Sequence, residues 1–416
     1  GADPSLEKRV LDMLEHVKRD GDQALIDYTR RFDAPDFDLE QLTAGESELQ
    51  SAYDAVDTGF FDILRTAVNN IKSFHQKQLR HSYFSTSADG TFLGQMVRPV
   101  DSAGLYIPGG KGGETPLISS ILMNGVPAVL AGVEDIAMVT PPRQDGTINP
   151  YLLVAAREVG INRIHKVGSA WAIAALAFGT DSVPRVDVIV GPGNIYVVLA
   201  KKIVAGLVGI DLLAGPSEIL VIADHTAHPD FVAADLLSQA EHDSMASAVL
   251  ITTDDQLAEK VKQSLQRQLQ NLARKDTARE SLDQYGAVFL VEDLEKGAVL
   301  ANRIAPEHLE LQIQDPWPYL GKIKHAGAIF IGNYTPEAVG DYFAGPNHVL
   351  PTAGTARFAS ALGVENFLKR TSVVSYSRAA LTRDADSIVR LAELEGLGAH
   401  AASVSVRLAD LDPGKR

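Results

Sequence analysis

The chain has 416 residues, of which 45% are hydrophobic and 22% are charged, and its formal net charge is -15. This length allows two or more domains with substantial cores, and the acidic balance without a Lys/Arg-dense run argues against binding to nucleic acid or anionic membranes. The chain has no cysteine, which excludes disulfides and thiolate ligands, so a metal would be held by His, carboxylate or amide oxygen.

No apolar run reaches the ~18 residues needed to cross a membrane, and the first residues, GADPSLEKRV, contain no signal-peptide core. We therefore expect a cytoplasmic enzyme. Residues 5–80 are predicted to be helical scaffold, because apolar side chains recur every three to four residues near the start and again from about Glu46 to Gln78.

A short apolar strand is predicted within residues 104–110, GLYIPGG, and it ends in a Pro-Gly-Gly turn. Glycine reaches backbone conformations that other residues avoid, so a ligand could approach the chain closely at this turn. A plain glycine turn is the alternative interpretation.

From residue 117 onward, predicted helices and strands alternate. The first block has strands at 135–140, 163–168 and 186–190 and helices at 117–130, 149–160 and 170–179. The second block has strands at 218–223, 248–252, 287–291 and 328–331, and a helix at 387–395 follows a break near 351–363. This rhythm predicts an α/β fold with two tandem doubly wound, incomplete Rossmann-like parallel sheets, a helical N-terminal segment and a small C-terminal segment.

Residues 191–194, GPGN, follow the apolar run VDVIV and precede a predicted helix at 195–207. Free N–H groups at such a helix start suit phosphate or another anion. The segment is not a GxGxxG fingerprint, because Tyr196 stands where the third glycine would fall. Dinucleotide binding and a simple Asn cap after a tight turn both stay open.

A helix is predicted over residues 231–243, where Asp235, Gln239 and His242 would form one polar stripe. Gln239 and His242 could point at one centre and ligate a cation such as zinc. A solvated helix face is the alternative.

Residues 302–311, NRIAPEHLEL, place Glu307 next to His308 directly after a proline. Burial or a nearby cation can bring both side chains into use as acid or base near pH 7, although such pairs are also common on surfaces. Further along, Asp341 and His348 fall in a Gly/Pro-rich loop at 340–352.

The chain resembles the histidinol dehydrogenase family through several long motifs that follow in register. They are AGPSE (214–218), SQAEHD (238–243), APEHLEL (305–311), GDYFAGPNHVLPT (340–352) and EGLGAHAASV (395–404), joined by GLYIPGG and GPGN. The resemblance implies a zinc enzyme that oxidises L-histidinol to L-histidine through bound histidinal in two NAD-dependent steps, the last step of histidine biosynthesis. It also implies a homodimer with intertwined domains.

The resemblance further implies a division into a main domain (1–105 with 217–362), a cofactor-binding domain (106–216) and a C-terminal dimerisation segment (363–416). The implied zinc ligands, which would also contact the substrate, are Gln239, His242, Asp341 and His400. The implied substrate contacts are Ser217, His308, His348 and Glu395, and the implied cofactor positions are Tyr106, Trp171 and Asn194. In family dimers, the ligand at the position of His400 comes from the partner subunit.

Trp171 lies in the segment GSAWA (168–172) and departs from the family, which commonly has Gln at this position. Its indole offers one N–H donor but no carbonyl acceptor, so NADP or an altered cofactor pose stays open.

Our mechanistic hypothesis assigns the adjacent bases Glu307 and His308 to two consecutive proton transfers. His308 accepts the hydroxyl proton in the first oxidation, and Glu307 deprotonates the water that attacks the aldehyde in the second.

Two alternative functions are open at this point. One is a different zinc- and NAD-dependent alcohol dehydrogenase that acts on a small alcohol without an imidazole. The other is a catalytically idle α/β binding or scaffold protein that retains zinc.

Overall fold

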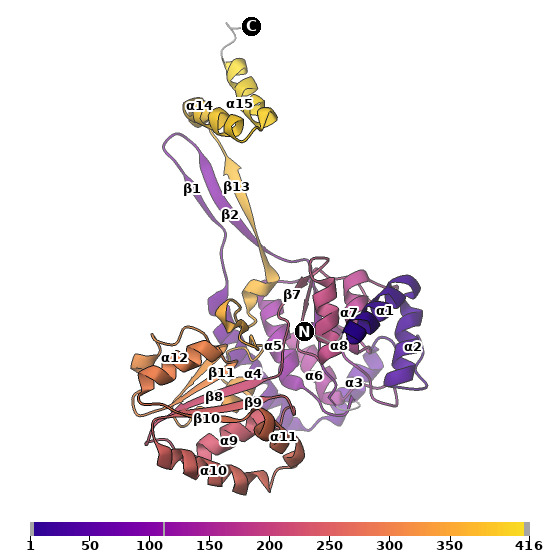
Figure 1. The fold of residues 1–416 in the computed structure, drawn as a ribbon. Coiled ribbons are helices and arrows are strands. Elements are labelled where there is room, and N and C mark those ends of the chain that lie inside the picture. Colours follow the sequence, from indigo (N-terminus) through magenta and orange to yellow (C-terminus); the bar gives the residue numbers. More distant parts are fainter. Residues whose placement is uncertain (1–3, 111–112, 412–416) are drawn as a thin grey trace. The chain divides into compact units, whose positions relative to one another are not determined.

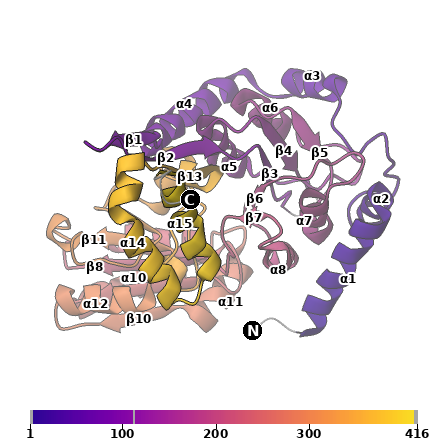
Figure 2. The same cartoon turned by 90° about the horizontal axis from the view of Figure 1, so that it is seen from above.

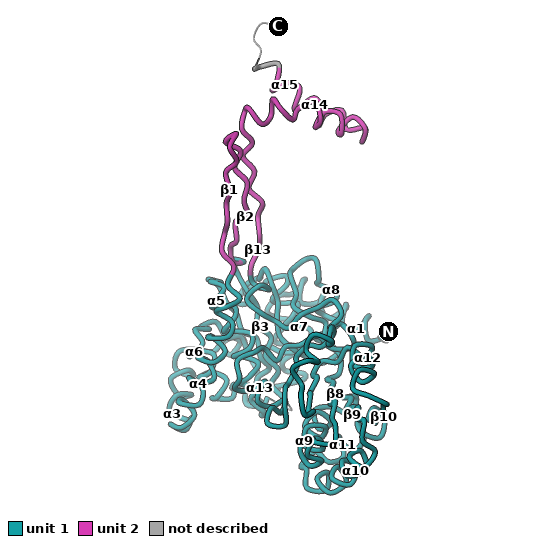
Figure 3. Tube along the Cα trace, turned by 90° about the vertical axis from the view of Figure 1, so that its left-hand side faces the viewer, with its two compact units in different colours: residues 1–79, 100–367 teal, residues 80–99, 368–416 magenta. Residues whose placement is uncertain are grey.

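The computed structural model describes residues 4–110 and 113–411. The chain divides into two compact units (Figure 3). Unit 1 comprises Gly1–Leu79 and Val100–Phe367, and unit 2 comprises Arg80–Pro99 and Leu368–Arg416.

The first sheet of unit 1 is parallel, and its five strands follow the order β5-β4-β3-β6-β7. The strands are β3 (Ser102–Tyr106), β4 (Asp135–Val139), β5 (Arg163–His165), β6 (Val188–Val190) and β7 (Gly209–Ile210). The winding changes direction between neighbouring strands β3 and β6. Doubly wound sheets bind ligands at the carboxyl ends of the strands at such a switch point.

Helices cover both faces of this sheet (Figures 1 and 2). One face packs against α7 (Ser169–Phe178) and α8 (Ile195–Val204), outside which lie α1 (Pro4–Asp20) and α2 (Asp22–Phe32). The other face carries α5 (Ile118–Ala131) and α6 (Pro150–Val159), with α3 (Glu46–Ala55) and α4 (Thr58–His75) outside them. Because strand side chains alternate, the Gly104 position approaches Leu176 of α7 while Leu105 lies toward α5.

The second sheet of unit 1 is also parallel, in the order β10-β9-β8-β11-β12. Its strands are β8 (Glu218–Ala223), β9 (Ser247–Thr252), β10 (Ala287–Leu290), β11 (His308–Gln312) and β12 (Ala328–Ile331). Ile219 and Val221 pack toward α9 (Pro229–Ala240) and α10 (Asp255–Leu269), whereas Leu220 and Ile222 pack toward α12 (Leu294–Ile304). Helix α11 (Lys275–Tyr285) lies against α9, and the short α13 (Glu337–Tyr342) follows β12.

Unit 2 contains an antiparallel sheet and two helices. The sheet has the order β1-β2-β13, with β1 (Tyr83–Thr86), β2 (Phe92–Pro99) and β13 (Leu368–Ser375), and the helices are α14 (Arg378–Leu394) and α15 (Gly398–Leu411). Large apolar side chains are exposed on this unit, namely Val374, Leu391, Leu394 and Val406. Across the described part of the chain, no helix has the length and apolar character needed to cross a membrane.

The predicted α/β class with two parallel sheets is confirmed, and β8 and β12 have the predicted bounds. The helix predicted over 231–243 ends earlier, at Ala240, because Glu241 and His242 turn back to bond the carbonyls of Leu237 and Gln239. His242 therefore lies beyond the helix, and the predicted polar stripe of a single helix is wrong.

Two other local predictions differ from the structure. The predicted loop at 340–352 begins inside α13, which continues to Tyr342. The predicted helix at 387–395 is the end of the longer α14, and strands β1, β2, β7, β11 and β13 and helix α15 were not predicted.

Candidate active site

A cavity of about 300 Å³ in unit 1 brings together segments from both sheets. The loop Gly191–Gly193, which follows β6, forms part of its wall. Seven residues singled out from the sequence also line it: Ser217, Gln239, His242, Glu307, His308, Asp341 and His348. The cavity therefore places a glycine-rich loop beside a group of acid, base and amide side chains.

The second sheet contributes the amino ends of its strands to the cavity. Glu218 begins β8 and His308 begins β11, and these strands are parallel neighbours with His308 paired to Ile219. Helix α9 follows β8 and runs back toward the amino ends of the strands, so Gln239 near its end reaches the same edge. Glu307 and His308 thus face the cavity because they stand where β11 starts.

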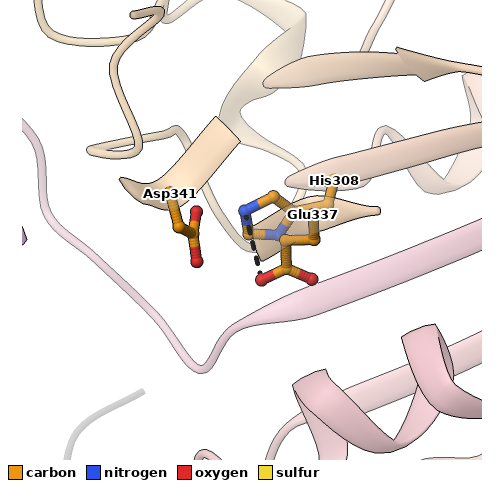
Figure 4. A group of neighbouring side chains, drawn as sticks. All are labelled: His308, Glu337 and Asp341. Atoms are coloured by element: carbon orange, nitrogen blue, oxygen red, sulfur yellow. Dashed lines mark ion pairs between the residues drawn. The ribbon is translucent and has the colours of Figure 1, made fainter. Parts of the chain in front are cut away.

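His308 is buried, and its ring orientation is set by one backbone contact. Its Nδ1 lies 3.0 Å from the carbonyl oxygen of Glu218, which is only an acceptor, so we assign the proton to Nδ1. Nε2 is then the basic nitrogen, and it lies 3.6 Å from Oε1 of Glu337 (Figure 4). Burial lowers the pKa of His308 to about 3, which makes the free ring neutral near pH 7.

Glu307 is also buried, and its carboxylate Oε2 accepts the backbone N–H of Glu218 at 3.0 Å. Burial is the main reason that the pKa of Glu307 is raised to about 8, and the neighbouring carboxylates of Glu218 and Asp341 raise it further. Its Oε2 lies 3.7 Å from Nδ1 of His308, beyond hydrogen-bonding distance. The two side chains are therefore not hydrogen-bonded to each other, and each is held by a different backbone group of Glu218.

His308, Glu337 and Asp341 converge on one point (Figure 4). Each offers one potential ligand atom, and these atoms lie within 4.8 Å of one another. Glu337 and Asp341 are four residues apart on α13, so they share a helix face. Burial raises the pKa of Asp341 to about 6 and that of Glu337 well above its ordinary value.

Gln239 extends this group from α9. The amide atom of Gln239 nearest to this group lies 3.1 Å from Nδ1 of His308 and 3.2 and 3.1 Å from the two carboxylate oxygens of Glu337. With the proton on Nδ1, an amide oxygen at this position accepts it, whereas an amide nitrogen there would donate to Glu337. The arrangement concentrates oxygen and nitrogen donors, without sulfur, around buried carboxyl groups whose negative charges repel one another. Protons or a cation can relieve that repulsion.

The comparisons with known proteins agree with this geometry. A sequence model of the family described as histidinol dehydrogenase matches residues 2–408. The chain belongs to the histidinol dehydrogenase family.

Individual histidinol dehydrogenases are similar over nearly the whole chain. The protein of Desulfotalea psychrophila is 56% identical over 406 residues, which cover 98% of this chain and 94% of that protein. That of Nitratidesulfovibrio vulgaris is 56% identical over 405 residues, covering 97% and 93%. The crystal structure of histidinol dehydrogenase from Elizabethkingia anophelis superimposes with a TM-score of 0.93 at 40% identity, covering 99% of this chain and 94% of that one.

The zinc ligands implied by the histidinol dehydrogenase family are only partly gathered in the cavity. Gln239 and Asp341 line it together, and His242 lines it as an exposed side chain outside the tight cluster. His400, like the predicted substrate contact Glu395, belongs to unit 2.

Glu337 was missed from the sequence, although it is the carboxyl group nearest to Nε2 of His308 in the cluster of Figure 4. The available signal was its four-residue spacing from Asp341. A four-residue spacing places two side chains on one face only in a helix, and the sequence predicts a loop from Gly340 onward, so the pair is not recognised.

The implied cofactor positions lie at and around the carboxyl ends of the first sheet. Tyr106 ends β3 and is buried, and its hydroxyl accepts the backbone N–H of Ser169 at 3.1 Å. Asn194 caps α8 by accepting the N–H groups of Tyr196 and Val197 at 3.0 and 3.2 Å. The Asn cap proposed from the sequence is thus present, and it leaves dinucleotide binding by the loop as a prediction.

Trp171 is buried in the core beside α2. Its ring stacks on Tyr28 and Phe32, with centroid distances of 5.3 and 5.5 Å. This packing gives the indole a structural role, and its contact with a cofactor stays a prediction.

Proposed function

We propose that this chain oxidises L-histidinol to L-histidine through bound histidinal, in two NAD-dependent steps with zinc, as the last step of histidine biosynthesis. Membership of the histidinol dehydrogenase family supports the overall reaction. The observation that carries the chemistry is the pair of buried bases at the start of β11, Glu307 and His308, beside the cluster of carboxyl and amide groups.

The residues present fit a zinc ion. The buried Glu337 and the half-buried Asp341 lie close to His308, and an imidazole, an amide and carboxylates are suitable zinc donors. We propose that Gln239, His242 and Asp341 hold the metal together with His400 of the partner subunit. When bound, zinc would orient and polarise the amino alcohol, and NAD would accept the hydride in each step.

The side chains of this chain move the protons. In the first oxidation, Nε2 of His308 takes the hydroxyl proton, because Nδ1 is already committed to the Glu218 carbonyl. In the second, the Glu307 carboxylate takes a proton from the water that adds to the aldehyde carbon. Positive charge near Asp341 lowers the pKa of Glu307 and makes this carboxylate available near neutral pH.

His348 is suited to position the substrate. Burial lowers its pKa to about 4, so its ring is neutral at pH 7. Its Nε2 is buried and has no hydrogen-bond partner among the described residues. A neutral imidazole that lines the cavity can bond a polar group of the bound amino alcohol or aldehyde.

A homodimer belongs to the same proposal. Unit 2 exposes Val374, Leu391, Leu394 and Val406, each by more than 60% of its surface. Leu391 and Leu394 are three residues apart on α14 and share a helix face, and an exposed apolar face of this kind favours burial against another protein. A second copy of the chain is the partner that the family resemblance implies, and it would also supply His400.

The direct test measures NADH formation by the zinc-loaded protein with L-histidinol and NAD. We expect two NADH for each L-histidinol consumed and no comparable rate with small diols or amino alcohols that lack an imidazole. Faster turnover of a non-imidazole alcohol would instead support a different alcohol dehydrogenase. Absence of NADH with every alcohol would contradict the enzymatic proposal.

A further inference from the structure

A buried ion pair stands behind the glycine-rich loop of the cavity. Lys201, on α8, pairs with Asp211, which directly follows β7, and their side chains are only 3% and 1% exposed. Both residues line the same cavity as Glu307 and His308. Neither residue has a role in the proton transfers proposed above.

Both members of the pair bind the same residue of the loop. Nζ of Lys201 donates to the carbonyl oxygen of Gly191 at 3.0 Å. The N–H of Gly191 donates to Oδ2 of Asp211 at 2.7 Å. The two side chains therefore fix Gly191 through both of its backbone polar groups.

Gly191 is also confined from the side of β3. Its φ is +120°, a conformation that L-residues rarely adopt, and a Cβ atom there would lie 2.1 Å from the carbonyl oxygen of Tyr106. The loop therefore lies in close contact with the end of β3, which carries the implied cofactor position Tyr106. Asn194, three residues after Gly191, is a second implied cofactor position.

Stability alone does not explain a buried ion pair in this place. Removing two charges from water is expensive, and replacing such a pair by apolar side chains is often neutral or stabilising. Here the ion pair fixes the backbone conformation of the loop between β6 and α8, which lies at the topological switch point of the first sheet.

We propose that Lys201 and Asp211 are positioning residues that hold the loop Gly191–Asn194 in the conformation that binds the dinucleotide. The inference rests on the NAD dependence proposed above and adds residues to it. Because the loop is ordered before the ligand arrives, binding does not incur the cost of ordering it. Lys201 acts through Gly191, since its own charge is neutralised by Asp211.

The test uses the double variant Lys201→Met/Asp211→Asn in the full-length, zinc-loaded protein. The two changes together leave no unpaired charge, and the amide that replaces the Asp211 carboxylate keeps an oxygen that can accept the Gly191 N–H. NAD binding is measured by calorimetry without histidinol, together with the KM values of both substrates. We expect NAD to bind about tenfold more weakly, equivalent to about 1.4 kcal/mol, and the KM for histidinol to change little.

Lys202→Met is the matched control. Lys202 is the next residue on α8, its side chain is 53% exposed, and it pairs at 3.3 Å with Glu7, away from the loop. The same substitution there should leave NAD binding unchanged. If the double variant unfolds at the assay temperature, NAD binding by the variant and the wild type is compared at a lower temperature at which both are folded, with the same expected weakening.

The possible results separate the two proposals. A folded variant that binds NAD as tightly as the wild type would overturn the positioning role. Weaker NAD binding accompanied by an equal loss of histidinol binding would also overturn it, since that pattern indicates general damage to the cavity. A wild-type protein that binds NAD but does not oxidise histidinol would contradict the proposed function, while the calorimetric comparison would still decide the positioning role.

Discussion

Glu218 and Glu307 bond each other reciprocally across neighbouring strands. The N–H of Glu218 donates to the Glu307 carboxylate at 3.0 Å, and the N–H of Glu307 donates to the Glu218 carboxylate at 3.3 Å. The carbonyl of Glu218 also holds Nδ1 of His308. One residue at the start of β8 therefore orients both bases at the start of β11.

The side chain of Glu218 should matter through its oxygen more than through its charge. Glu218→Ala removes the acceptor of the Glu307 N–H, and a small misplacement of a catalytic group can lower kcat by about tenfold to about a hundredfold. Glu218→Gln keeps an oxygen in place and should retain most of the activity. Steady-state rates with L-histidinol check this, and equal activities of both variants and the wild type would refute it.

Glu307 should serve the second oxidation selectively. Glu307→Gln cannot take a proton from water, so aldehyde oxidation should fall by about 10²- to 10⁴-fold, the usual contribution of a general base. Alcohol oxidation, assigned to His308, should fall much less. Separate assays with histidinol and histidinal measure the two rates, and equal losses in both would argue against the division of roles.

Metal binding should depend on Gln239 and Asp341 but not on Asp235. Removal of a residue that only hydrogen-bonds a metal ligand typically lowers metal affinity by about 10- to 100-fold. Gln239→Ala and Asp341→Asn change proposed ligands directly, so they should weaken zinc binding at least that much. Asp235 precedes Gln239 by one helical turn, but its carboxylate accepts Nε2 of Gln312 at 2.7 Å.

Asp235→Asn is therefore the control on the same helix, and it should keep its zinc. Zinc content after dialysis, measured by elemental analysis on folded protein, distinguishes the variants. Full zinc content in Asp341→Asn would remove that residue from the proposed ligand set.

The two sheets were predictable because buried parallel strands are continuous apolar runs, as in EILVIA of β8. Strand β11 was missed because HLELQ has polar residues at every second position, and in the structure these are buried. Gln312 donates to Glu310 and Asp235, so a polar network replaces the apolar pattern that identifies a strand.

The composition of the cavity depends on spatial arrangement that local patterns do not contain. The first sheet offers the carboxyl ends of its strands, as the switch-point rule expects, whereas the second offers amino ends at Glu218 and His308. Likewise, β2 pairs with β13 from the far end of the chain. The family motifs contain most residues that line the cavity, whereas Glu337, Lys201 and Asp211 lie outside these motifs and reach the cavity only through the fold.

The metal-free protein should lose stability as the pH rises. Burial raises the pKa of Glu307 from its ordinary 4.5 to about 8 and that of Glu310 to about 9. Each group binds its proton more tightly in the folded protein than in the unfolded chain. Its stabilising contribution is complete below pH 4.5 and is lost progressively as the pH rises through 8 to 9.

Thermal unfolding in the presence of a chelator checks this prediction, and Tm should be lower at pH 9 than at pH 5. Glu310→Gln cannot ionise, so it should flatten the decrease, whereas Glu280→Gln on the exposed face of α11 should not. Zinc should raise Tm more at pH 9 than at pH 5, because positive charge then replaces the lost protons. A Tm that rises between these pH values in the metal-free protein would contradict the assignment of protonated, buried carboxyl groups.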